Sequence, residues 1–520
     1  KLTHRMLVAG IPLEALRPIV LESQRITTPG SLLGQILPLI LVLMTITGAI
    51  YPAIDLTAGE RERGTLETLM VCPVPPFELI VGKFMVVTTV ALIGAALNLA
   101  SVSATVFFGG FERIVTGGGA GGFPLARLPL ILMTLIPFAV LFSAVMIAVC
   151  SYARTFKEAQ NYVTPVILAA LIPGGIAAVL TPRLEGTVLV VPVANMVLLT
   201  RELLLGSVVT LGQVAVVLIS TTIYAAAAVG LAARVFGQEA VVFSDSGSLK
   251  TALSRRFFVP RPRPSSAIVM LVIALLFPVW FYVQAAAQPE HGEDITALLE
   301  RTAVLMPICF ILLPVAILAY WKIDIRNSLQ LRRPRARHVA AGVLLGVALW
   351  VPVHEIGVAI QNLVGIPESI IEMNRMLEAA LRTLHPAVSL LILAVIPGLS
   401  EELLFRGFLL SGLASSLRKW GAIIATACIF AAFHFIGIRF PTTALVGIVL
   451  GYVCWQSRSI WPSIIAHVLH NSMALLPLFW PDFLRYMAPG ESEHVRPLLL
   501  LGAAALIAAG LGLARRYSHD

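Results

Sequence analysis

Runs of about twenty apolar residues recur along the whole chain, and such runs leave few folds open. About thirteen runs are long enough to be candidates for helices that cross a bilayer. They lie near 32–54, 84–108, 128–150, 162–180, 209–233, 267–287, 304–321, 339–360, 387–410, 422–436, 443–456, 460–480 and 498–514. The runs at 422–436 and 443–456 are short, and we expect tilted helices there. The sequence therefore predicts an all-α polytopic membrane protein with about 13 transmembrane helices in two helical bundles.

Composition excludes several function classes. The 520 residues are 58% hydrophobic and 12% charged, whereas a soluble chain is about 25% charged. Too few charges remain to cover a water-facing surface, which argues against a soluble enzyme, a disordered chain and a nucleic-acid binder. The net charge of +9 is typical of basic loops on one side of a membrane rather than of a nucleic-acid footprint.

Loop charge predicts the orientation. If the loop 55–83 lies inside, the inner segments hold about 22 basic residues and the outer ones about 10. We therefore expect a multi-pass cell-membrane protein with a cytoplasmic C-terminus. Thirteen spans then place the first visible residue, Lys1, outside. We interpret 1–31 as the remnant of a truncated N-terminal or extracytoplasmic region, with a further helix upstream.

The composition changes once along the chain. Residues 237–265 run polar, then basic, then proline-rich, which predicts a cytoplasmic linker between membrane modules at 32–236 and 266–516. In the second module, 366–384 combines helical apolar spacing with five charges, which predicts an amphipathic helix at the membrane interface.

The second module carries charges inside an apolar run, in the motif 401–406 (EELLFR). Placing one unpaired charge at the centre of a membrane helix costs about 2.5–3.5 kcal/mol. We therefore expect these charges to have partners that offset this cost. Glu402 and Arg406 are four residues apart and can pair on one helix face. Glu401 points about 100° away and lacks that partner, so that burial would make it a plausible general base.

Two more polar patterns follow in later apolar runs, at 430–434 (FAAFH) and 467–471 (HVLHN). His467 and Asn471 share a helix face. Glu401 with one histidine could deprotonate a water, while the second histidine and Asn471 donate to a developing oxyanion. Glu401, His434 and His467 could instead hold Zn²⁺, whose bound water would be the nucleophile. Spacing leaves both mechanisms open, and each polar side chain could also be a helix-packing contact.

These three patterns resemble the CAAX-protease and bacteriocin-processing (CPBP, or Abi) family of intramembrane proteases. The resemblance covers about half the chain and implies an eight-helix fold that hydrolyses peptide bonds within the bilayer. It implies that Glu401 activates water with His434, that His467 and Asn471 form the oxyanion site, and that Glu402 and Arg406 complete the first motif. A peptide or protein in the membrane would be the substrate.

Two other histidine patterns give weaker evidence for a catalytic site. His354 and Glu355 begin the string HEIGV, which lacks the second histidine of a zinc-protease HExxH motif, so a supporting polar role is expected. His470 lies about 60° from His467 on the helix and could replace it geometrically. We rank it lower because Asn471 is not four residues from it.

The inner loop 55–83 is the informative part of the first module. Charges flank a short stretch with apolar spacing, which predicts an amphipathic helix on the inner face or a solvated loop. Its string GERERGTLETLM (59–70) resembles the coupling segment of ABC-type export permeases, the sodium exporters in particular. These typically have six spans, one more than we count. The resemblance assigns an ATPase-coupling role to Glu60, Gly64, Thr65 and Glu67.

No phosphate-binding GxxxxGK[ST] motif occurs in the sequence, so ATP would act only through a separate ATP-binding cassette subunit. The leading hypothesis is thus an ABC permease subunit fused to an intramembrane endopeptidase. Two alternatives stay open: a C-terminal half that binds peptides or acts as a chaperone without catalysis, and a proton-coupled secondary transporter that uses the buried carboxylates.

Overall fold

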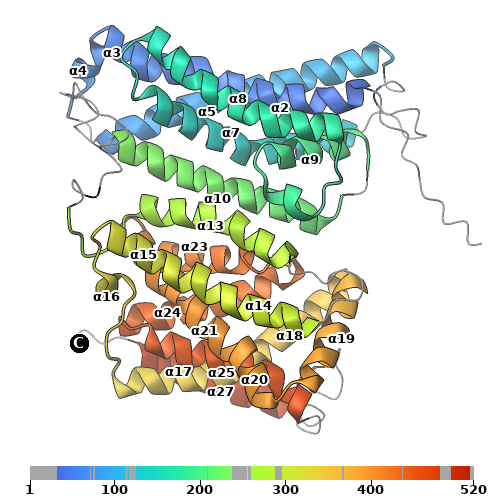
Figure 1. Cartoon of the computed structure of the whole chain (residues 1–520), viewed down its shortest axis with the longest axis vertical. Coiled ribbons are helices and arrows are strands. Elements are labelled where there is room, and N and C mark those ends of the chain that lie inside the picture. The colour runs from blue at the N-terminus through green and yellow to red at the C-terminus, as the bar shows by residue number, and fades with distance from the viewer. Residues whose placement is uncertain are drawn as a thin grey trace, which may run out of the picture.

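The structure is a computed structural model of an entirely helical chain (Figure 1). It describes residues 32–70, 72–73, 76–111, 115, 125–207, 209–236, 255, 259–286, 295–365, 368–435, 437–480 and 494–515. Within these ranges, the strand-like pairing is a single bridge between Arg261 and Ile323. The predicted N-terminal remnant 1–31 and most of the linker 237–265 lie outside the described residues.

The first bundle packs long apolar helices around a core of aliphatic and aromatic side chains, among them Ile46, Leu135 and Phe138. Its helices are α2 (Leu32–Ile54), α5 (Pro76–Phe108), α7 (Leu128–Cys150), α8 (Phe156–Leu180), α9 (Ala194–Leu204) and α10 (Leu211–Phe236). Three short elements follow α2: η2 (Asp55–Gly59), α3 (Glu60–Glu62) and α4 (Thr65–Met70). The Thr155 hydroxyl caps α8 by accepting from the Glu158 amide. The apolar α9 was not expected from the sequence and is almost wholly buried.

The second bundle is formed by the C-terminal half (Figure 1). Its longer elements are α13 (Ser266–Ala286), α14 (Ile295–Pro307), α15 (Leu313–Tyr320), α17 (Ala336–Ala348), α18 (Trp350–Val364), α19 (Glu368–Thr383), α23 (Lys419–Ala432), α24 (Phe440–Ser457), α25 (Trp461–Phe479) and α27 (Pro497–Ala514). The predicted amphipathic helix at 366–384 is confirmed as the helix α19. Between α19 and α23, one helical run over 386–413 carries the charged motif.

A polytopic helical protein is confirmed, whereas the count of about 13 spans is not. Among the described residues, ten helical runs are long and apolar enough to cross a membrane. The apolar parts of α13 and α23 are shorter, and α24 is not among the ten. Each of the thirteen apolar runs nevertheless contains a helix. Apolar length therefore located these helices, but it does not determine which of them cross the membrane.

The two bundles share one apolar core. Helix α10 of the first packs along α13 of the second (Figure 1). The Phe277 ring of α13 meets Phe433 and Phe435, with centroids 5.2 and 5.0 Å apart. An apolar cluster therefore runs from the first bundle to the segment next to His434.

Small residues let α25 pack close to its neighbours. A Cβ atom added at Gly342 or Gly346 of α17 would lie 2.4 or 2.6 Å from the carbonyl oxygens of Pro462 and Ala466. One added at Gly398 would lie 2.6 Å from the Val468 side chain. Glycines at these positions allow the backbones to approach, as is common in membrane helix packing. Close packing against Gly346 on one side and Gly398 on the other therefore fixes the position of the α25 turn that contains His467.

Replacing Gly346 with alanine is expected to destabilise the second bundle by about 1–3 kcal/mol, the range for overpacked cores. The added methyl would meet the Ala466 oxygen and the Leu469 Cβ, 2.6 and 2.8 Å away. Gly502→Ala on α27 is the matched control, because nothing lies within 4 Å of that position. It should leave stability unchanged or raise it, since alanine is the better helix former. Thermal denaturation of both variants in the same detergent measures the difference, and equal midpoints would contradict the packing argument.

Candidate active site

The charged motif lies where a long helix changes its winding. The run over 386–413 consists of α20 (Pro386–Leu390), η7 (Leu391–Val395), α21 (Ile396–Glu402), η8 (Leu403–Leu409) and α22 (Leu410–Leu413). Both η7 and η8 are π-helical, and such wider turns are frequent at functional sites. Glu401 and Glu402 end α21, and Arg406 lies within η8.

Glu402 and Arg406 form the ion pair that their spacing predicts. Arg406 Nη1 donates to Glu402 Oε1 at 2.7 Å, and both side chains are 0% exposed. Arg406 Nη2 also donates to the Gly447 carbonyl at 3.2 Å. The guanidinium lies over the Phe430 ring, 4.3 Å from its centroid, which is cation–π geometry. The cation thus neutralises Glu402 in the core of the bundle.

His467 joins this pair to Glu401. Its Nδ1 lies 2.9 Å from Glu402 Oε1, and its Nε2 lies 3.6 Å from Glu401 Oε2. A carboxylate paired with Arg406 only accepts, so Nδ1 carries a proton and donates it. In the neutral imidazole Nε2 is then an acceptor that faces Glu401. The structure therefore brings Glu401 together with His467, from α21 and α25.

His434 contacts the Phe430 ring, which also contacts His467. It follows α23, and its Nδ1 lies 3.0 Å from the Phe430 carbonyl oxygen. Its ring meets the Phe430 ring edge to face at 4.9 Å, and the His467 ring meets that ring at 5.8 Å. Within the described residues, no hydrogen bond or ion pair joins His434 to Glu401. The water-activating pair implied by the family resemblance, Glu401 with His434, is therefore not joined directly in this structure, and its role stays a prediction.

Asn471 lies one turn after His467 on α25 and is half-buried. Its amide nitrogen is 3.4 Å from the Leu393 carbonyl oxygen, a long contact that engages one of its two hydrogens weakly. A second N–H remains to donate elsewhere. Its predicted role as an oxyanion donor stays a prediction.

The donor set does not fit a metal ion in this arrangement. Across the described ranges, no three His, Cys, Asp or Glu side chains gather closely enough to hold one. His434 is turned toward its own backbone, and His467 donates to Glu402. The zinc hypothesis for Glu401, His434 and His467 stays a prediction, and no step below uses a metal.

The HEIGV string has a structural use that agrees with its predicted supporting role. Glu355 Oε2 lies 2.7 Å from His494 Nδ1, and Oε1 accepts from the Val495 amide at 2.7 Å. Its neighbour His354 stacks on Trp350 with centroids 5.3 Å apart. Glu355 therefore holds the segment that leads into α27.

The predicted coupling residues divide into buried and exposed ones. Glu60 is buried and pairs with Lys83, which also donates to the Leu56 carbonyl at 2.7 Å. Gly64 is exposed with φ of +69°, a backbone conformation that favours glycine. Thr65 is exposed too, and its hydroxyl donates to the Glu60 carbonyl at 3.1 Å. The side chain of Glu67 lies outside what the structure describes.

Two contacts join the segment 59–70 to the turn that precedes α8. Arg61 Nη1 donates to the Ala153 carbonyl at 3.1 Å, and Glu62 Oε2 accepts from the Phe156 amide at 2.7 Å. The short helices α3 and α4 and the start of α8 thus form one surface at this end of the first bundle (Figure 1).

Two separate stretches of the chain match known families. Residues 14–241 match the family model of an ABC-2 family transporter protein. Residues 383–473 match that of a type II CAAX prenyl endopeptidase Rce1-like family, and this range contains all six candidate site residues of the second bundle. The chain thus contains one segment similar to ABC-2 family transporter proteins and a second segment similar to Rce1-like endopeptidases. The Rce1-like match begins at the end of α19 and ends within α25.

The ABC-2 segment has a curated relative. The chain is 26% identical over 183 residues to the ABC transporter permease protein NatB of Bacillus subtilis (strain 168). The alignment covers 35% of this chain and 47% of NatB, so that the chain spans about half the length of this relative. No solved structure matches the chain.

Three features that position the site residues were not predicted from the sequence: the Phe430 ring, the Gly447 carbonyl and the glycines of α17. Phe430 was part of the FAAFH pattern, yet its ring contacts Arg406 and both histidines. Gly447 contributes only a backbone carbonyl, for which a sequence has no signal. The glycines of α17 had one available signal, since Gly342 and Gly346 form a small-xxx-small pattern.

Proposed function

We propose that the chain is a bifunctional membrane protein in which an ABC-type export permease is fused to an intramembrane endopeptidase. The Rce1-like segment supports peptide hydrolysis in the second bundle, and the ABC-2 segment supports transport by the first. The main support for the proposed peptidase activity is that Glu401 lies close to His467, beside the Glu402–Arg406 ion pair.

This approach creates a position for one water molecule. When the imidazole of His467 is neutral, its Nε2 and Glu401 Oε2, which lie 3.6 Å apart, are both acceptors. Two acceptors at this distance repel each other unless a donor lies beside both. A water can give one hydrogen to each, and its oxygen lone pairs then point away from both groups. The same contacts would orient and activate it as a nucleophile.

Hydrolysis then needs no covalent enzyme intermediate. The water oxygen attacks the peptide carbonyl carbon while Glu401 accepts a water proton. The resulting oxyanion would be stabilised by N–H groups of Asn471 and His434. Glu401 returns its proton to the amide nitrogen, the C–N bond breaks, and a carboxylic acid and an amine leave. Relative to the family resemblance, this assignment exchanges the roles of His434 and His467.

Cleavage of membrane-anchored peptides by the purified chain in proteoliposomes tests this proposal. The wild type should release fragments with new termini, and the release should disappear when Glu401 loses its charge. Peptides that bind tightly but stay intact would favour the peptide-binding or chaperone alternative.

For the first bundle, we propose that a separate ATP-binding cassette subunit docks on α3, α4 and the turn before α8. The exposed Gly64 and Thr65 would meet the ATPase, whereas the buried Glu60 would act by positioning the segment. Two hydrogen bonds, from Arg61 to the Ala153 carbonyl and from the Phe156 amide to Glu62, would make this surface move as a rigid unit.

Glu60→Gln is expected to lower recruitment of the ATPase at least about tenfold. The change removes the Glu60 carboxylate from the buried Lys83 ammonium, and breaking a buried ion pair costs about 3–5 kcal/mol, where 1.4 kcal/mol is a factor of ten. Co-purification of a tagged ATPase with the membrane-extracted chain measures recruitment. Glu78→Gln, an exposed carboxylate in the first turn of α5, is the control and should recruit normally. Equal recovery with both variants would remove the positioning role of Glu60.

A further inference from the structure

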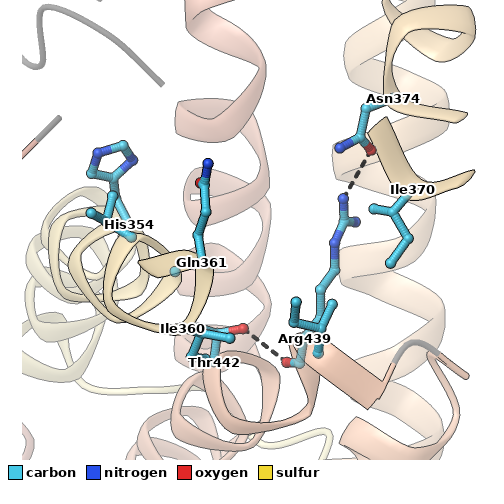
Figure 2. A pocket seen from close by; sticks show the side chains of 10 residues that line it. His354, Ile360, Gln361, Ile370, Asn374, Arg439 and Thr442 are labelled. Atoms are coloured by element: carbon cyan, nitrogen blue, oxygen red, sulfur yellow. Dashed lines mark hydrogen bonds between the residues drawn. The ribbon is translucent and has the colours of Figure 1, made fainter. Parts of the chain in front are cut away.

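A second cavity lies apart from the Glu401–His467 cluster. It occupies about 220 Å³ between α18, α19 and the start of α24 (Figure 2). None of the six candidate active-site residues lines it. Because pockets for drug-sized ligands occupy about 300–1,000 Å³, this one suits a head group or a similarly small polar moiety.

The polar lining of the cavity contains one cation and no acid. The polar side chains are His354, Gln361, Asn374, Arg439 and Thr442. Arg439 Nη2 donates to Asn374 Oδ1 at 3.0 Å, as Figure 2 shows. An amide carries no charge, so this contact orients the guanidinium without neutralising it. Within the described residues no carboxylate forms an ion pair with Arg439, which leaves a positive charge available to an anion.

The surroundings of the cavity are those of a membrane surface. Gln361 and Ile370 line it, while Leu363 and Ile371, close to them in the chain, are exposed by 85% and 38%. On a membrane protein, exposed apolar side chains of this kind contact acyl chains. Helix α19 is amphipathic, the type of helix that lies at the interface between head groups and acyl chains. A ligand that joins an anion to apolar chains would match both features.

We propose that this cavity binds the phosphate head group of an anionic phospholipid, with Arg439 as the phosphate ligand and Asn374 as the residue that orients it. The planar guanidinium suits bidentate contacts to phosphate oxygens. The wall that holds Arg439 is the short element η9 (Gly437–Arg439), three residues after His434. A bound lipid would therefore fix the segment that carries His434. The inference stands independently of whether the second bundle cleaves peptides.

Native mass spectrometry of the purified full chain tests the proposal, with phosphatidylglycerol, phosphatidylcholine and soluble glycerol phosphate as separate probes. The wild type should retain phosphatidylglycerol in preference to phosphatidylcholine. Arg439→Gln should lose about fivefold of that preference, since a surface cation contributes about 1 kcal/mol to anionic-lipid binding, whereas Arg439→Lys should lose less.

Arg375→Gln is the matched control, because Arg375 is an exposed cation on α19 that does not line the cavity. It removes the same charge and should keep the preference. Equal loss in Arg375→Gln and Arg439→Gln would indicate a diffuse electrostatic effect and overturn the site. Binding of glycerol phosphate as tight as that of the lipid would assign the cavity to a soluble anion and overturn the lipid proposal.

Discussion

Glu401→Gln should lower the rate of peptide cleavage by about 10²–10⁴-fold, the usual contribution of a general base. Glutamine keeps the size of the side chain but cannot accept the water proton. The same change should not lower stability. Glu401 is only 8% exposed, its nearest ionisable partner is His467 at 3.6 Å, and a buried carboxylate without a close cation disfavours the folded state. Cleavage of a reporter peptide and thermal denaturation, measured on one preparation, separate the two effects.

Glu378→Gln provides the control for that experiment. Glu378 is a half-exposed carboxylate on α19, paired with Arg382 at the surface. Its loss should leave both cleavage and the unfolding midpoint unchanged. Unaltered cleavage in Glu401→Gln would refute the proposed mechanism. Loss of cleavage together with unfolding would instead identify Glu401 as a structural residue.

Apolar length and helical spacing were sufficient to locate most of the fold. The runs at 32–54 and 128–150 coincide with α2 and α7, because a bilayer-length helix is specified locally by its own side chains. The Glu402–Arg406 contact was predictable for the same reason, since both groups lie within one helical turn. What local spacing cannot specify is which helices truly span, because that depends on tilt and on the bilayer.

The sequence alone did not predict the contacts between helices. No spacing rule places His467 against Glu401 rather than His434, because the helices concerned are separated by loops of different length. The decisive features are close backbone approaches at Gly346 and Gly398, which set the rotation of α25. The π-helical turns of η7 and η8 also shift the facing of residues around the motif, and no pattern in the sequence indicates them. The members of the site could therefore be proposed, but not their pairing.

Arg406→Met should destabilise the second bundle by about 3–5 kcal/mol, because it leaves the Glu402 carboxylate in the core without its cation. The chain offers a closely matched comparison, since Glu378 and Arg382 form a second Glu–Arg pair with the same four-residue spacing and the same 2.7 Å distance. That pair is about half-exposed, so Arg382→Met should cost no more than about 0.5 kcal/mol. Unfolding of the two variants by a denaturing detergent in bicelles measures both.

The double variant Glu402→Gln/Arg406→Met distinguishes charge from packing. If the cost of Arg406→Met comes from the uncompensated carboxylate, removing that charge as well should restore most of the stability, since neutral replacement of a buried pair is often tolerated. If the cost comes from the lost contacts of the guanidinium with the Phe430 ring and the Gly447 carbonyl, the double variant should stay as unstable as the single one. Restored stability would show that Arg406 chiefly allows two adjacent carboxylates to be buried at the end of α21. It would also explain how Glu401 can lie in an apolar bundle beside His467 without a cation of its own.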